Sequence, residues 1–227
     1  MRYQNPCHGT FLSRPNRFIA MVDVAGRTER CHVKNTGRCA ELLLPGARLV
    51  LDKAAGARRA TAYDVVAVYK GGLLINMDSM APNKAFGEFL REGAYVDSLT
   101  HVKPEVRFGA SRFDFYAETA AKKIFIEVKG CTLEEEGVAL FPDAPTDRGV
   151  KHLRELGRAV RAGYEAHGVF LIQMKGCRCF RPNRKTHAAF ADALGDAAEA
   201  GVILRAFDCL VTESGMMVDE PVRVELA

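Results

Sequence analysis

The sequence predicts two domains, a small β-barrel over residues 1–83 and an α/β domain over residues 84–227. Short alternating segments broken by turns fill the first region, a pattern that favours a barrel. Helical stripes alternate with apolar strand-like runs in the second, which is typical of an α/β domain. With 227 residues, 48% of them hydrophobic, the chain is long enough to build two cores.

About five short strands are expected in the first domain. The turns between them contain Ala25-Gly26-Arg27, Asn35-Thr36-Gly37 and Lys70-Gly71-Gly72. A brief helix is expected over residues 40–44. So many strands in so short a region favour a small barrel, and the OB-fold is the predicted type. The expected strands cover residues 17–24, 28–33, 48–51, 61–69 and 73–76.

Helices and strands alternate in the second domain, after an expected boundary at Pro82-Asn83. The clearest helix is predicted over residues 147–162, where an apolar stripe recurs at helical spacing and Gly163 ends the pattern. That stripe consists of Val150, Leu153, Leu156 and Val160. The other elements expected are helices at 85–91 and 190–200 and strands at 113–117, 122–129, 168–174 and 202–209.

The segment 122–129 ends in an unusual pair of side chains. If it is a strand, Glu127 and Lys129 point to one face, because strand side chains alternate with period 2. Ile124 and Ile126 then point to the other face, into the core. An acid beside an amine at the end of a buried strand suits metal-assisted phosphodiester chemistry, in which the acid binds a hard cation and the amine holds a water.

A second carboxylate, Asp114, lies on the strand expected just before. Residues 118–123 are polar and short enough for a hairpin turn, so the two strands would bring Asp114 beside Glu127. This D…ExK arrangement is the signature of PD-(D/E)XK nucleases. The order of helices and strands in the second domain agrees with such a nuclease-like α/β core.

The predicted metal ligands are Asp114, Glu127 and the backbone carbonyl of Val128, and the predicted ion is Mg²⁺ or Mn²⁺, because such ions prefer oxygen ligands. Lys129 would orient the attacking water. The alternative is the same fold without turnover, with the acids merely paired to Lys129 or Arg112. Metal-dependent cleavage and binding without cleavage therefore both stay open.

The helix over residues 147–162 begins with basic residues. Arg148 and Lys151 could reach a phosphate there, helped by the positive end of the helix dipole. Thr146 or Asp147 could cap the helix. Lys151 is therefore a candidate for a supporting catalytic role, whereas His152 could serve the site or be a buried, hydrogen-bonded histidine.

Positive charge is concentrated in the first domain. Residues 1–83 carry 12 Lys and Arg against 6 Asp and Glu, whereas residues 84–227 carry 20 against 22. Basic side chains with aromatic neighbours suit a nucleic-acid surface, although barrel turns are rich in such residues for geometric reasons alone. The candidate nucleic-acid-binding residues are Arg14, Asn16, Arg17, Phe18, Lys34, Asn35, Arg38, Arg112 and Arg148.

Several classes of protein are disfavoured. The chain has no long apolar run for a membrane span and no secretion signal at its start, so we expect a cytoplasmic protein. Its seven cysteines lack a CxxC pair, and reduced thiols are favoured over zinc ligands at Cys31, His32 and Cys39 or at Cys177 and Cys179. A transcription regulator lacks support, because no convincing helix-turn-helix is present.

Several long motifs resemble the sugar fermentation stimulation protein A family over nearly the whole chain. The resemblance implies an N-terminal OB-like domain, a C-terminal PD-(D/E)XK-like domain, DNA binding, and a regulatory role in sugar metabolism. It leaves open whether the DNA is single- or double-stranded, and no obligate protein partner is evident. His187 departs from the family pattern, which has an acid there. The matching motifs are RPNRF at 14–18, CHVKNTGR at 31–38, ELLLPG at 41–46, SRFDF at 111–115, EVKGCTL at 127–133, FPDAPTDRGVKHLREL at 141–156 and GV at 201–202.

Overall fold

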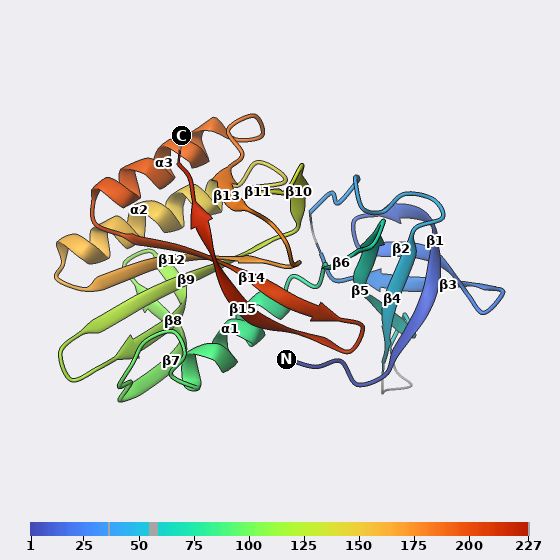
Figure 1. The fold of residues 1–227 in the computed structure, drawn as a ribbon, viewed down its shortest axis with the longest axis horizontal. Helices are drawn as coiled ribbons and strands as arrows, with labels where there is room; N and C mark the ends of the chain where they lie inside the picture. Colours follow the sequence, from blue (N-terminus) through green and yellow to red (C-terminus); the bar gives the residue numbers. More distant parts are fainter. Residues whose placement is uncertain (36, 55–58, 227) are drawn as a thin grey trace.

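A β-barrel and a larger α/β domain make up the chain (Figure 1). The computed structural model describes residues 1–35, 37–54 and 59–226, so Thr36 of the expected turn lies outside the described residues. The hairpin formed by the last two strands extends from the α/β domain toward the barrel, and the N-terminal segment runs beside it (Figure 1). None of the described helices is long and apolar enough to cross a membrane.

The first domain is a closed barrel with OB-type strand pairing, as predicted. Its sheet has the order β3-β2-β1-β4-β5-β6, and the additional parallel pairing of β3 with β5 closes β1 to β5 into a ring. Closure leaves few unpaired strand edges, which stabilises a small all-β domain. The strands are β1 (Pro6–Asn16), β2 (Ile19–Val24), β3 (Arg27–Val33), β4 (Arg48–Lys53), β5 (Tyr63–Lys70) and β6 (Leu73–Asn76).

The barrel differs from expectation in one missed strand and one wrong helix. Strand β1 was not predicted, because irregular pairing with β2 between Phe11 and Asn16 breaks the period-2 alternation that identifies a strand. The helix expected at residues 40–44 is a turn in which the backbone N–H groups of Leu42 and Leu43 both donate to the carbonyl of Cys39. The two leucines are buried and add to the barrel core.

The second domain is a nine-stranded mixed sheet between helices. Its strand order is β10-β11-β13-β15-β14-β12-β9-β8-β7. Helix α1 (Ala81–Arg91) packs on one face, and α2 (Asp147–Arg161) and α3 (Ala188–Glu199) pack on the other. The strands are β7 (His101–Phe108), β8 (Ser111–Glu118), β9 (Lys123–Cys131), β10 (Leu133–Glu135), β11 (Val138–Phe141), β12 (Glu165–Ile172), β13 (Cys179–Pro182), β14 (Ile203–Thr212) and β15 (Gly215–Val224).

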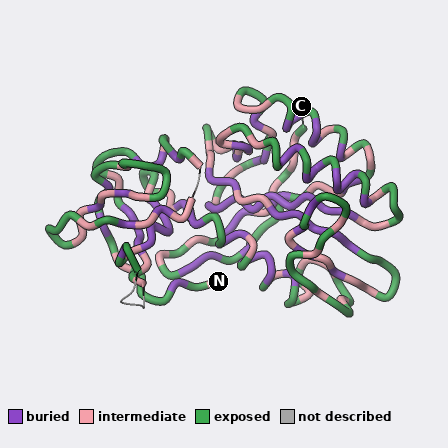
Figure 2. The backbone as a smooth tube through the Cα atoms, turned by 180° about the vertical axis from the view of Figure 1, so that it is seen from behind, coloured by how far each residue is buried: buried purple, intermediate pink, exposed green. Residues whose placement is uncertain are grey.

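The three helices and the antiparallel β8–β9 hairpin form where they were expected. Strand β12 lies between β9 and β14, parallel to both, and the middle of the sheet is the most buried part of the backbone (Figure 2). Burial on both faces explains its continuous apolar run. The edge strand β7 was not predicted, because it is largely solvent-accessible and contains Pro104, which only an edge strand tolerates.

Polar contacts join the two domains. The side-chain Nε2 of Gln173 donates to the backbone carbonyl of Asn76 at 3.0 Å, and the backbone N–H of Asn76 donates to the carbonyl of Gln173 at 2.9 Å. At the tip of the β14–β15 hairpin, Glu213 accepts a hydrogen bond from the Tyr69 hydroxyl at 2.6 Å. These contacts hold the barrel against the sheet on which the candidate site lies.

Candidate active site

The site is built where strands β8 and β9 separate. Their pairing runs from Glu118 opposite Lys123 to Phe115 opposite Ile126. Beyond this point the backbone N–H of Val128 donates instead to Oδ2 of Asp114, at 2.8 Å. The carboxylate of Asp114 therefore takes the place of a strand carbonyl, and this holds it close to β9.

The direction of β8 also changes at Asp114. Phe113 packs with Phe125 on the α2 side of the sheet, whereas Phe115 packs with Phe86 of α1 on the opposite side. In a regular strand, residues two positions apart share a face. The irregularity at Asp114 is therefore what lets this carboxylate reach between the two strands.

Both oxygens of Asp114 are held. Asn83, in the first turn of α1, donates to Oδ1 at 2.7 Å, while Val128 occupies Oδ2. Burial raises the pKa of Asp114, and the neighbouring charge of Glu127 raises it further. Two acids forced together in a poorly hydrated place are costly to the fold, which is typical of a functional site.

Glu127 is only 4% exposed, and its two carboxylate oxygens differ in their hydrogen bonding. Its Oε1 accepts from both Lys129 Nζ and His152 Nδ1. Its Oε2 is buried without a hydrogen-bond partner among the described residues. Burial acts strongly against ionisation, but the contacts with His152 and Lys129 together hold the pKa of Glu127 below its usual range.

His152 is a site residue that the sequence left undecided. Helix α2 begins at the N-cap Thr146, whose Oγ1 accepts from the backbone N–H of Gly149 at 3.0 Å, and this start places His152 on the buried side of the helix. The imidazole packs edge-on against Phe113, with ring centres 6.2 Å apart. The sequence did contain a signal for this role, because His152 is an ionisable residue on the otherwise apolar, buried side of α2.

A hard cation fits this arrangement. It would contact Oε2 of Glu127, which has no hydrogen-bond partner among the described residues, and reduce the repulsion between Glu127 and Asp114. The carbonyl of Val128, the residue after Glu127, could add a third oxygen. The described residues contain no group of three His, Cys, Asp or Glu side chains able to hold a metal. Two carboxylates are nevertheless what Mg²⁺ commonly takes from a protein, since it keeps several waters.

Other predicted residues of the second domain lie at varying distances from this centre. Arg148 Nε approaches His152 Nε2 at 3.4 Å, so it lies beside the site. Lys151 instead donates to the carbonyl of Ala110 at 2.8 Å, which ties α2 to the β7–β8 turn. Arg112 is exposed, and its guanidinium lies 3.5 Å from a carboxylate oxygen of Glu105 on the neighbouring edge strand.

Arg14 and Asn16 stabilise the barrel itself. The guanidinium of Arg14 donates to the carbonyls of Arg17 at 2.7 Å and Asn35 at 3.0 Å, and also to two carbonyls further along the same loop. The side-chain Oδ1 of Asn16 accepts from the backbone N–H of Phe18 at 2.9 Å, which shapes the β1–β2 turn. Both side chains position this region by bonding to its backbone.

Lys34 and Asn35 are also held by internal contacts. Lys34 forms an ion pair with the buried Asp78 at 2.6 Å. Asn35 donates to the carbonyl of Met77 at 3.0 Å and accepts from the backbone N–H of Gly37 at 2.8 Å. These bonds fix the loop that follows β3. The polar groups of both side chains are therefore already used within the protein.

Arg17, Phe18 and Arg38 are the solvent-facing members of the predicted set. Phe18 is 49% exposed, and the guanidinium carbon of Arg17 lies 5.9 Å from its ring centre. Arg38 is exposed as well. A cation beside an accessible ring provides both a phosphate contact and a stacking surface.

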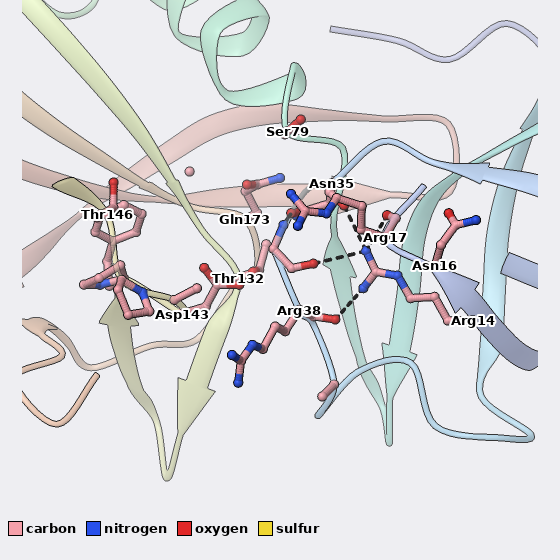
Figure 3. A pocket seen from close by; sticks show the side chains of 17 residues that line it. Arg14, Asn16, Arg17, Asn35, Arg38, Ser79, Thr132, Asp143, Thr146 and Gln173 are labelled. Carbon is pink, nitrogen blue, oxygen red and sulfur yellow. Dashed lines mark hydrogen bonds between the residues drawn. The ribbon is translucent and has the colours of Figure 1, made fainter. Parts of the chain in front are cut away.

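A cavity of about 880 Å³ lies between the barrel and the second domain (Figure 3). Five of the predicted nucleic-acid-binding residues line its barrel side. The residues of the opposite side were not predicted to bind nucleic acid, because they are scattered along the sequence of the second domain. The barrel and the linker to α1 contribute Arg14, Asn16, Arg17, Asn35, Gly37, Arg38, Ala40 and Ser79. The second domain contributes Gly130, Thr132, Phe141, Pro142, Asp143, Ala144, Pro145, Thr146 and Gln173.

The cysteines are free thiols, consistent with the expectation of reduced thiols. Burial raises the pKa of Cys177 to about 11 and that of Cys31 to about 12. Burial therefore disfavours the thiolate form of both side chains.

Comparisons with known proteins agree with the two-domain organisation. A family model described as SfsA N-terminal OB domain matches residues 12–77, and one described as Sugar fermentation stimulation protein RE domain matches residues 80–215. A sugar fermentation stimulation protein homolog of Desulfitobacterium hafniense (strain Y51) is 59% identical over 226 residues, covering 100% of this chain and 99% of the relative. A homolog from Ruminiclostridium cellulolyticum is 50% identical, with 100% of each chain covered.

A solved structure shows the same fold. It is described as that of Pyrococcus furiosus SfsA in complex with Ca²⁺, and it superposes with a TM-score of 0.90 at 30% sequence identity. The match covers 99% of this chain and 98% of that one. The likeness therefore extends over both domains.

Proposed function

Because the chain belongs to the sugar fermentation stimulation protein family, we propose that it binds DNA through its barrel and hydrolyses phosphodiester bonds at Asp114, Glu127 and Lys129 with a divalent cation. The observation that carries this proposal is the buried Oε2 of Glu127, which no donor in the described part of the chain reaches, beside the half-buried carboxylate of Asp114. Ionisable groups held together at a cost to stability are typical of a functional site. The Pyrococcus relative, described in complex with Ca²⁺, supports the choice of a hard cation.

Each residue has a distinct part in the proposed reaction. Asp114, Glu127 and the Val128 carbonyl would hold Mg²⁺ or Mn²⁺, which would polarise the phosphate and offset charge developing on it. Lys129, next to Glu127, would orient the water that attacks phosphorus. The bond from phosphorus to the leaving oxygen then breaks, which gives a phosphomonoester and a free hydroxyl group. His152 would keep the carboxylate of Glu127 in place.

The second candidate is a DNA-binding module that does not cleave. It is favoured by the contacts at Glu127 Oε1, which Lys129 and His152 already satisfy without a metal. Such a protein would bind DNA with a strong dependence on salt, because binding releases counterions from the phosphates. For either candidate a cytoplasmic location is proposed, and the free cysteines support it because a reducing compartment keeps thiols unpaired.

The test measures binding and cleavage together. Wild type, Glu127→Gln and Glu92→Gln are mixed with labelled single-stranded and duplex DNA, in Mg²⁺, Mn²⁺ or EDTA. Glu92 is exposed near the end of α1, so its variant matches the loss of charge outside the site. The proposal expects metal-dependent cleavage by wild type and Glu92→Gln, and at least about a 100-fold loss in Glu127→Gln. Intact substrate with wild type in both metals, despite binding, would establish the non-cleaving module.

A further inference from the structure

Strand β9 connects the candidate active site to the interdomain cavity. Glu127 and Lys129 belong to the site, and Gly130 of the same strand lines the cavity together with Thr132, which follows the strand. At about 3.3 Å per residue, Gly130 lies ~10 Å along the strand from Glu127. A polymer bound at the carboxylates therefore needs to continue only a short distance to enter the cavity.

The size of the cavity limits what can occupy it. Its volume, about 880 Å³, is typical of sites that enclose one drug-sized molecule, roughly 300–1,000 Å³. A duplex would need much more space than this volume, since its major groove alone is about 12 Å across. The cavity thus has room for a short stretch of one strand.

The barrel side of the cavity is suited to phosphates. Arg17 and Arg38 are exposed and line it, and neither forms an ion pair with any residue in the described ranges. Phe18, next to Arg17, offers an accessible ring on which a base can stack. The arginines therefore form a basic wall of the cavity, and the Phe18 ring lies beside it, next to Arg17.

The opposite wall is suited to bases. Gln173 is 2% exposed, and its Nε2 is fully used in bonds to Asn76 and Asp78. No donor among the described residues reaches its Oε1, which faces Gly130 so closely that a Cβ there would come within 2.3 Å. The carboxylate of Asp143 adds a further acceptor in this wall. Acceptors of this kind bind the amino groups of bases.

We infer that the interdomain cavity binds a single strand of nucleic acid, with its phosphates toward Arg17 and Arg38 and its bases toward Gln173 and Asp143. This inference rests on the nucleic-acid-binding part of the proposed function and names the substrate class as single-stranded. Gly37 of the barrel loop approaches Asp143 so closely that a Cβ would come within 2.4 Å of the carboxylate. The two walls therefore meet at this point, which closes one side of the cavity.

The test compares two double variants of the full chain. Arg17→Ala/Arg38→Ala removes the cavity arginines, and Arg27→Ala/Arg30→Ala removes the same charge from exposed residues of β3 that do not line the cavity. Binding is measured by fluorescence anisotropy in EDTA. The probes are a labelled single strand of about 12 nucleotides containing only adenine and cytosine, whose amino groups the proposed acceptors would bind, and a blunt duplex of equal length.

Wild type is expected to bind the single strand at least ~10-fold more tightly than the duplex. The cavity variant should bind the single strand about tenfold or more weakly, and the log–log slope of its salt dependence should fall by about 1.4, or about 0.7 for each phosphate that is no longer neutralised. The β3 variant should stay within about twofold of wild type. Equal affinity for duplex and single strand, or equally weakened binding in the β3 variant, would overturn the inference.

The outcomes also separate this inference from the proposed catalytic activity. Single-strand binding that depends on the cavity arginines, without cleavage in any metal, would support the inference and count against hydrolysis. Metal-dependent cleavage that the cavity variant retains in full on single-stranded DNA would leave hydrolysis standing and overturn the inference.

Discussion

Oδ2 of Asp114 accepts a hydrogen bond from the backbone N–H of Val128 at 2.8 Å, at the point where β8 separates from β9. A side-chain carboxylate thus replaces a strand carbonyl in the sheet. Val128 also carries the backbone carbonyl that would bind the metal, so one residue serves both roles. Strand separation and the position of the two acids are therefore parts of one local structure.

Replacing Asp114 by Asn is expected to remove cleavage without lowering stability. The raised pKa of Asp114 shows that its charge is costly beside Glu127, and the amide of Asn83 can rotate to bond the new side chain. In EDTA the melting temperature should stay equal or rise, by about 2–4 °C for each kcal/mol gained. Asp114→Ala, which leaves the Val128 N–H without an acceptor, should instead lower the stability by about 1–3 kcal/mol. Equal destabilisation by both variants would refute this interpretation.

Divalent cations are expected to stabilise the native state. A ligand at about 100 times its Kd raises the free energy of unfolding by about 2.7 kcal/mol. Thermal unfolding in increasing Mg²⁺ or Mn²⁺ should therefore raise the melting temperature of wild type and Glu92→Gln. Glu127→Gln lacks one of the two proposed carboxylates and should show little change. A shift of the same size in all three proteins would place the metal elsewhere.

His152 is expected to act as a positioning residue for Glu127. His152→Ala removes a buried hydrogen bond, so we expect a decrease of about 1–3 kcal/mol in stability and a lower kcat with little change in KM. His152→Asn can place its amide nitrogen near the former Nδ1 and should recover part of the kcat. Steady-state kinetics and urea unfolding measure the two effects. Equal kcat values for the two variants would argue against positioning.

Stability is expected to fall in mild acid because of His167. Its neutral ring is satisfied when Tyr95 donates to Nδ1, at 2.6 Å, and Nε2–H donates to Glu165, at 3.0 Å. Burial lowers the pKa of His167, with Glu165 opposing the shift only in part. The unfolded chain therefore takes up a proton first, and the stabilisation present above about pH 6.5 is lost as the pH falls.

Urea unfolding between about pH 7.5 and about pH 5.5 measures this effect. The stability difference between wild type and His167→Gln should shrink as the pH falls. His101→Gln changes an exposed histidine of β7 and should follow wild type throughout. A difference that is constant with pH would show that His167 does not titrate differently in the two states.

Gln173 is expected to couple the two domains. Gln173→Leu leaves the carbonyls of Asn76 and Asp78 without their donor, which should cost about 1–3 kcal/mol. Gln4→Leu, at an exposed position of the N-terminal segment, is the matched control and should change little. Urea unfolding of the full chain measures both. An unchanged stability in Gln173→Leu would mean that the interface is held by other contacts.

Local patterns predicted the regular parts of the fold well. The stripe of α2 and the apolar run of β12 identified those elements, because helical and strand periodicities reflect which face is buried. Irregular or edge strands escaped prediction. Strand β1 carries irregular pairing and β7 lies at the sheet edge, so neither has a regular alternation to detect.

The sequence by itself determined the two-domain organisation, the family, and the neighbourhood of Asp114, Glu127 and Lys129, because a hairpin brings residues close in sequence onto adjacent strands. The irregularity that turns Asp114 toward Val128 was visible only in the structure. Only the tertiary structure decided that His152 contacts Glu127 and that Lys151 bonds away from it, since the rotation of α2 against the sheet sets which side chains face the site. It also decided which basic residues face the interdomain cavity. Such contacts depend on how separate elements pack, and no local sequence pattern records that packing.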